Sequence, residues 1–92
     1  MAAALDDKGQ VEHTLRAVLA EILGLDAAQV AAFDHHSPLF GALPEFDSLA
    51  VAGLLTALEE RLGILIEDHE VDAEMMATFG SLLTFARAKT LR

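Results

Sequence analysis

The triplet Asp47-Ser48-Leu49 contains the side chain best suited to covalent chemistry in this chain. An aspartate directly before a helix can cap the free backbone N–H groups of the first turn. Ser48 would then be the first helical residue, and its hydroxyl would be free to project outward. A phosphodiester on that hydroxyl would lie at the positive end of the helix dipole. An isolated Asp-Ser pair is more often a simple cap, so the triplet alone leaves both interpretations open.

The other reactive side chains form weaker patterns. The chain has four histidines and no cysteine, and adjacent histidines such as His35 and His36 rarely share a metal, so we expect no metal site. The run Asp68-x-Glu70-x-Asp72 has the spacing that opens a calcium loop, but Ala73 stands where such a loop needs glycine. The Gly-x-Ser-x-Gly elbow of many hydrolases is absent and no strand is expected before Ser48, which argues against a catalytic serine.

Composition and charge narrow the classes of partner. The 92 residues are enough for one domain, and a hydrophobic content of 53% is enough for a core of aliphatic side chains. The net charge of −9 argues against binding to nucleic acid or to anionic membranes, and it favours partners with basic faces. No apolar run approaches the roughly 20 residues that span a bilayer, and no secretory signal is evident. We therefore expect a cytoplasmic protein without membrane insertion. The sequence gives no evidence for an oligomer, so a monomer is the default expectation.

Helical spacing of the apolar residues predicts an all-α domain over residues 9–90, after a flexible N-terminus of residues 1–8. Asp6 or Asp7 can cap the first helix. The expected elements are a helix over 9–23, a helical turn within 26–33, a helix over 48–62, a short helix over 71–76 and a last helix capped by Thr78, with Arg87, Lys89 and Arg92 near its end. Two prolines make most of 25–46 an irregular connection, which we expect four apolar residues to hold against the core: Leu39, Phe40, Leu43 and Phe46.

The helix over 48–62 has an unusual exposed face. Its apolar stripe consists of Val51, Leu54, Leu55, Leu58 and Leu62. The opposite side near the N-terminus then presents Leu49 and, in part, Ala52, Gly53 and Thr56, where a solvated helix face is usually charged. We expect this small, apolar surface to contact partners.

The order and spacing of motifs along roughly residues 10–90 resemble those of acyl carrier proteins. The motifs are Leu39-Phe40, Asp47-Ser48-Leu49, Ala57-Leu58-Glu59-Glu60, Gly63-Ile64-x-Ile66 and Thr78-Phe79. The resemblance implies an acyl-carrier-like four-helix bundle with three main helices, a short third helix and a long loop between the first two.

The family's modified serine matches Ser48. The resemblance therefore implies a 4′-phosphopantetheine arm, transferred from coenzyme A to Ser48 by a Mg²⁺-dependent phosphopantetheinyl transferase, with Asp47 assisting the attachment. The arm ends in a thiol, which would give a cysteine-free chain its thioester chemistry as a carrier and not an enzyme. Implied partners are the transferase and the enzymes that load and transfer acyl groups, and the residues expected to contact them are Leu49, Ala52, Thr56, Glu59 and Glu60. Helical spacing favours packing in the core for Met75, Met76, Phe79 and Phe85. The resemblance also allows them to line an acyl pocket.

The chain departs from the family in one respect. Carriers of central fatty acid biosynthesis have acidic residues in the first two turns after the serine, whereas residues 50–53 here are uncharged. We therefore expect a specialised carrier. The runs Leu43–Leu49 and Gly80–Leu82 are similar to discrete carriers of bacterial exosortase and exopolysaccharide systems.

Two alternatives stay open. A peptidyl or aminoacyl carrier usually has Gly-Gly shortly before the serine, where this chain has Glu45-Phe46-Asp47. An unmodified acidic interaction module would use the same surface without an arm. The intact Asp47-Ser48-Leu49 triplet favours the modified carrier over that module.

Overall fold

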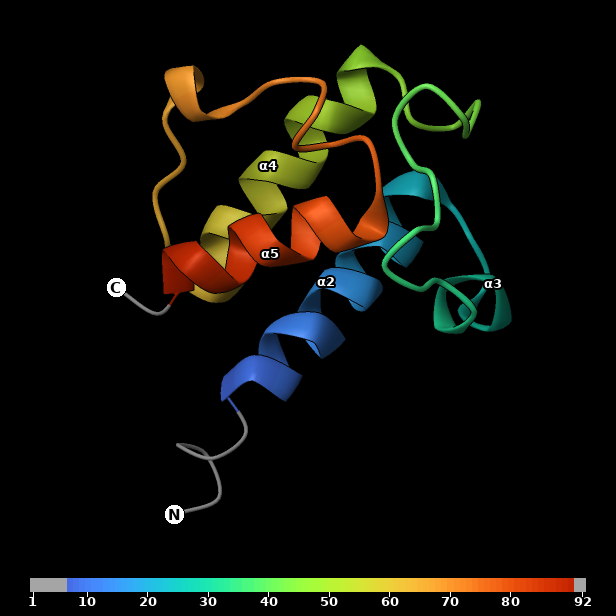
Figure 1. Ribbon diagram of the computed structural model, residues 1–92, viewed down its shortest axis with the longest axis horizontal. Helices are drawn as coiled ribbons and strands as arrows, with labels where there is room; N and C mark the ends of the chain where they lie inside the picture. Colours follow the sequence, from blue (N-terminus) through green and yellow to red (C-terminus); the bar gives the residue numbers. More distant parts are fainter. Residues whose placement is uncertain (1–6, 91–92) are drawn as a thin grey trace.

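The computed structural model describes the backbone of residues 7–90 and the side chains of residues 9–90. Its elements are α2 (Asp7–Leu23), α3 (Ala27–Ala31), α4 (Ser48–Leu62), the 3₁₀ turn η1 (Asp68–Glu70) and α5 (Phe79–Thr90) (Figure 1). Strand-like pairing within residues 7–90 is limited to an isolated bridge between Pro38 and Thr78, and the predicted all-α fold is confirmed. No helix in this part of the chain is both long and apolar enough to cross a bilayer.

Some predictions concern residues at the two ends of the chain that the structure does not describe. α2 begins at Asp7, two residues before the expected start of the domain at residue 9. Asp7 thus belongs to the helix, whereas the capping role considered for Asp6 lies outside the described residues. Most of the expected flexible segment 1–8 and the position of Arg92 near the last helix also lie outside them.

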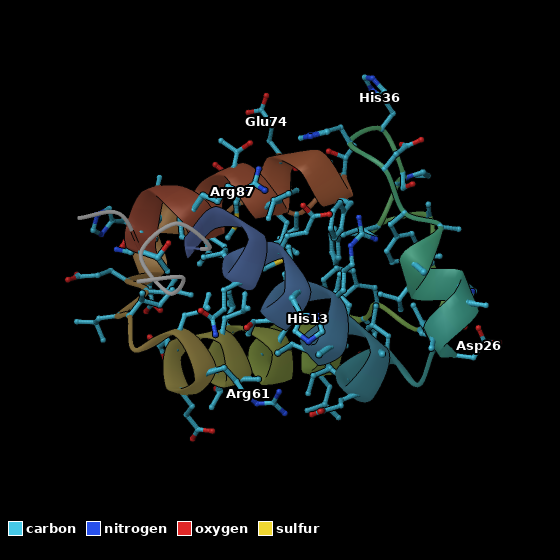
Figure 2. The ribbon with its side chains drawn as sticks, turned by 90° about the horizontal axis from the view of Figure 1, so that it is seen from below. His13, Asp26, His36, Arg61, Glu74 and Arg87 are labelled. Atoms are coloured by element: carbon cyan, nitrogen blue, oxygen red, sulfur yellow. The ribbon has the colours of Figure 1, made fainter. Side chains whose placement is uncertain are left out.

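The central helix of the bundle is α2, which packs against α3, α4 and α5. Figure 2 shows α2 lying between α4 and α5. The core consists chiefly of the stripes expected from helical spacing: Val11, Leu15, Val18, Leu19 and Leu23 of α2, Leu54 and Leu58 of α4, and Phe79, Leu82, Leu83 and Ala86 of α5. Three members of the α4 stripe, Val51, Leu55 and Leu62, are only partly buried against that core.

The helix ends follow the capping signals in the sequence. Asp26 caps α3 by accepting a hydrogen bond from Gln29 N at 2.8 Å. Gly63 ends α4 with a left-handed φ of 66°, a conformation that favours glycine. Thr78 caps α5, since its Oγ1 accepts from Ser81 N at 3.1 Å.

The connection between α3 and α4 pairs with the segment that leads into α5. Leu39 N donates to Ala77 O at 2.8 Å, and Phe40 N donates to Met76 O at 3.1 Å. The chain then turns, and Gly80 N donates back to the carbonyl oxygen of His35 at 3.0 Å. These hydrogen bonds hold the loop that leads to Ser48 against the start of α5.

The four apolar residues expected to hold this loop differ in depth. Leu39 and Phe46 are buried, and Leu43 is partly buried against the core. Phe40 is 37% exposed, so it anchors less than expected. Its ring packs edge-on against that of Phe46, with the centroids 5.7 Å apart.

The predicted short helix over 71–76 is wrong in position and type. The helical turn lies earlier, in η1, where Glu67 N donates to the Glu70 carboxylate at 3.0 Å and Glu70 N donates to Glu67 O at 2.9 Å. Residues 73–76 form turns instead. The Met76 carbonyl accepts from Phe40 N of the loop before α4, so the end of this segment pairs with that loop.

Arg16 joins α2 to α3, although its spacing places it on the polar side of the first helix. Its guanidinium donates to the carbonyl oxygens of Val30 at 2.6 Å and Phe33 at 3.1 Å. It also pairs with Glu12 at 2.6 Å and lies 4.5 Å from the centroid of the Phe79 ring. Arg16 therefore fixes the start of the long loop against the core.

We expect Arg16→Met to lower the free energy of unfolding by about 1–3 kcal/mol, because the two carbonyl groups lose a charged donor. For a domain of this size the melting temperature should fall by roughly 5–15 °C, measured by far-UV circular dichroism. The control is Arg61→Met, which removes an exposed pair with Glu21 and should change stability little. Equal melting temperatures for the two variants would contradict the role given to Arg16.

Lys89 of α5 holds η1, since its Nζ lies 2.9 Å from both carboxylate oxygens of Glu70. This hydrogen bond, with that from Glu67 N, lowers the pKa of Glu70 below its ordinary value of 4.5. A lowered folded-state pKa contributes stability that is complete above the unfolded pKa and is lost as the pH falls through the folded pKa.

The melting temperature of the wild type should therefore fall as the pH drops below about 4.5. We expect the melting temperature of Lys89→Met to fall less steeply over that range, because the pKa of Glu70 would then lie closer to its unfolded value. Thermal melts of both proteins between neutral and acidic pH give the comparison. Parallel curves would contradict a pH-dependent contribution of the Lys89–Glu70 contact to stability.

Candidate functional site

Asp47 is the N-cap of α4, which makes Ser48 the first residue of the helix. The Asp47 backbone is extended, with a φ of −99°, and its Oδ1 accepts from Ala50 N at 2.9 Å. Val51 N donates to Asp47 O at 2.9 Å. Because Asp47 makes the capping hydrogen bond, Ser48 is not needed as a cap.

Among the three serines of the chain, Ser48 has the free hydroxyl. Ser37 Oγ accepts from Asp34 N at 2.8 Å, and Ser81 Oγ donates to Met75 O at 2.8 Å. Ser48 is exposed, and its hydroxyl makes no hydrogen bond with residues 9–90. This hydroxyl can therefore react as a nucleophile without breaking a contact of the fold.

The start of α4 also suits a negatively charged group. The backbone N–H groups of Ser48 and Leu49 precede the first N–H paired within the helix, and neither donates to another residue of the described chain. Free N–H groups and the helix dipole together favour an anion at this position. A phosphodiester linked through the Ser48 oxygen fits these residues.

Two hollows meet at Phe40, on the loop side of Ser48. The first is lined by Ser48, Phe46 and Phe40, together with the loop between them. The second is apolar and is lined by Phe40, Val51, Val71, Asp72, Ala73 and Met76. Of the four residues considered for the core or an acyl pocket, Met76 and Phe79 are both buried in the core, and Met76 also lines this second hollow. Met75 lines a separate hollow that includes His35, and Phe85 lines neither of the hollows at Phe40.

A groove runs along the outer face of α4, from Asp47 toward the end of the helix. Leu49 is 81% exposed at its start, as helical spacing predicts. Four of the five residues expected to contact partners line the groove: Leu49, Ala52, Thr56 and Glu60. The fifth, Glu59, lies elsewhere, and its carboxylate accepts from Ile66 N at 2.8 Å.

Sequence reasoning missed part of this groove. Ile22 of α2 and Glu45 of the preceding loop also line it. A helical wheel of α4 alone could not include Ile22, which lies on another helix. Beside the groove, Arg61 donates to Glu21 at 2.5 Å, which raises the pKa of Arg61 and lowers that of Glu21.

The histidines and the acidic run do not gather into a second site. Figure 2 shows His13 on α2 and His36 in the loop, on different sides of the molecule. Over residues 9–90, no three His, Cys, Asp or Glu side chains lie close enough to hold a metal ion. Two carboxylates of the calcium-like run already accept hydrogen bonds, Glu70 from Lys89 and Asp72 from Met75 N.

Comparisons with known proteins point to one family. A model of the phosphopantetheine attachment site matches residues 13–87. An acyl carrier protein of Exiguobacterium sp. is 33% identical over 82 residues, covering 89% of this chain and 96% of that protein. One from Helicobacter pylori strain G27 is 38% identical over 71 residues, covering 77% and 83% respectively. The solution structure of a holo acyl carrier protein from Nitrosomonas europaea superposes with a TM-score of 0.79 at 34% identity, over 89% of this chain and 96% of that one.

Proposed function

The chain belongs to the acyl carrier protein family, and on that premise we propose that it carries acyl groups as thioesters on an arm attached to Ser48. Members of this family are carriers and not enzymes, and their covalent cofactor is 4′-phosphopantetheine. The observation that supports Ser48 as the attachment residue is its free, exposed hydroxyl at the first position of α4. The relatives are acyl carriers, which favours acyl over aminoacyl cargo.

In the proposed attachment, the Ser48 oxygen attacks the phosphorus of coenzyme A that bears the pantetheine. The new bond is a serine phosphodiester, the broken bond joins that phosphorus to the nucleotide, and 3′,5′-ADP leaves while the hydroxyl proton passes to a base. The Mg²⁺ that this transfer needs would be held mainly by the transferase and the diphosphate, and not by this chain. Asp47 assists as a positioning residue, since its capping hydrogen bond fixes the first turn of α4. The attached arm supplies a thiol that this cysteine-free chain lacks.

We further propose a specialised pathway, such as the exosortase and exopolysaccharide systems that the sequence resembles, in place of central fatty acid synthesis. The support is the uncharged run Ala50–Gly53. A basic enzyme surface that pairs with acidic residues at these positions in central carriers would have no acidic partner in this run. Acyl-loading and acyl-transferring enzymes would instead read Leu49, Ala52 and Thr56, with acids at the rim of the groove. The cytoplasmic location and the monomeric state of the protein remain predictions.

The test of acyl carriage combines intact mass with thioester chemistry. The purified protein is incubated with an acyl-coenzyme A, Mg²⁺ and a broad-specificity phosphopantetheinyl transferase. We expect a mass gain of one acylated arm, and neutral hydroxylamine should then remove the acyl group while leaving the arm. A gain that resists hydroxylamine would contradict a thioester.

A further inference from the structure

Gly53 lies inside α4, where glycine is among the least favourable residues. The fold gives no reason for it. A Cβ built at position 53 would meet only the Ile22 side chain, at 3.6 Å, which is an ordinary van der Waals contact. Gly53 also lacks the positive φ that makes glycine necessary at Gly24, Gly41 and Gly63. Alanine would therefore fit the fold and favour the helix.

The missing side chain of Gly53 affects the shape of the groove on the outer face of α4. Gly53 lies in the groove of α4, between Ala52 and Thr56, and opens the groove floor toward Ile22. A methyl group at this position would fill the space above Ile22. The groove begins at Asp47 and Leu49, on either side of Ser48, so an enzyme bound in it would lie next to the Ser48 hydroxyl.

The charges around the groove indicate what can occupy it. Its lining includes three acids, Glu45, Asp47 and Glu60, and no base. The nearest cation on α4, Arg61, is paired with Glu21. A partner with an apolar side chain flanked by basic groups would complement both the apolar floor and the acidic rim. A second copy of this chain, with its net charge of −9, would be repelled.

We propose that Gly53 keeps the groove open for an apolar side chain of the phosphopantetheinyl transferase, the enzyme that must reach the Ser48 hydroxyl. This inference rests on the proposed function. Gly53 would favour binding of the transferase but lower the stability of α4. A side chain at position 53 should therefore weaken binding and raise the melting temperature.

The test is Gly53→Ala, assayed with coenzyme A, Mg²⁺ and a broad-specificity transferase, with initial rates taken from intact mass. We expect the KM for the carrier to rise about tenfold while kcat stays within about twofold, because one methyl group blocks an apolar contact. The melting temperature should rise by about 3–6 °C from the gain in helix propensity. The matched control is Gly9→Ala in α2, where a Cβ meets nothing within 4 Å. It should leave the KM unchanged and should not lower the melting temperature.

Each outcome is decisive. An unchanged KM for Gly53→Ala, with the wild type fully modified, overturns the inference and leaves the proposed function standing. A lower melting temperature also overturns it, because the fold would then require the glycine. A wild type that accepts no arm contradicts the proposed function itself, which makes the two failures distinguishable.

Discussion

Ser48→Ala should gain no mass when it is incubated with coenzyme A, Mg²⁺ and a broad-specificity transferase, whereas the wild type should gain one phosphopantetheine group. The loss should be complete, since alanine has no oxygen to form the phosphodiester. The fold should persist, because the Ser48 hydroxyl makes no hydrogen bond within the described chain and alanine is favoured in helices. Intact-mass spectrometry measures the first effect, and circular dichroism checks the second.

The matched control is Ser37→Ala, which removes a hydroxyl held by Asp34 in the loop before α4. This variant should still accept one arm. A mass gain by Ser48→Ala would show that the arm attaches to another hydroxyl, which would contradict the proposed site. A wild type that is folded but accepts no arm from any of several transferases would favour the unmodified interaction module.

Gly80→Ala should destabilise the fold strongly. A Cβ at this position would lie 2.6 Å from the His35 carbonyl oxygen, 2.8 Å from its Nδ1 and 3.0 Å from its Cα. The His35 backbone cannot simply move away, because its carbonyl accepts from Gly80 N at 3.0 Å. We expect a loss of about 2–3 kcal/mol from this overpacking, and a melting temperature lower by roughly 10–20 °C.

Far-UV circular dichroism is the suitable measurement, since the chain has no Trp or Tyr for intrinsic fluorescence. Gly53→Ala provides a control within the same protein. Its new Cβ meets only a side chain at 3.6 Å, so its melting temperature should shift in the opposite direction. A Gly80→Ala protein as stable as the wild type would mean that the close approach of the loop to α5 is not maintained in solution.

Local sequence determined the three long helices and the start of the site. The apolar stripes and the capping residues Asp47, Gly63 and Thr78 act within a few residues of their own position. For the same reason the exposure of Leu49 beside Ser48 could be predicted from helical spacing alone. The attachment of an arm to Ser48 stays a prediction that these local features support.

Only the tertiary structure decided where the connections lie. The helical turn after α4 lies at Asp68–Glu70, and not at 71–76, and Lys89 of α5 contacts Glu70 there. Arg16 turned inward because carbonyl groups 14 and 17 residues away came within reach of its guanidinium. The groove likewise needed Ile22 of α2 beside Gly53 of α4. These features depend on contacts between residues far apart in the chain, which helical periodicity does not encode and which form only when the helices pack.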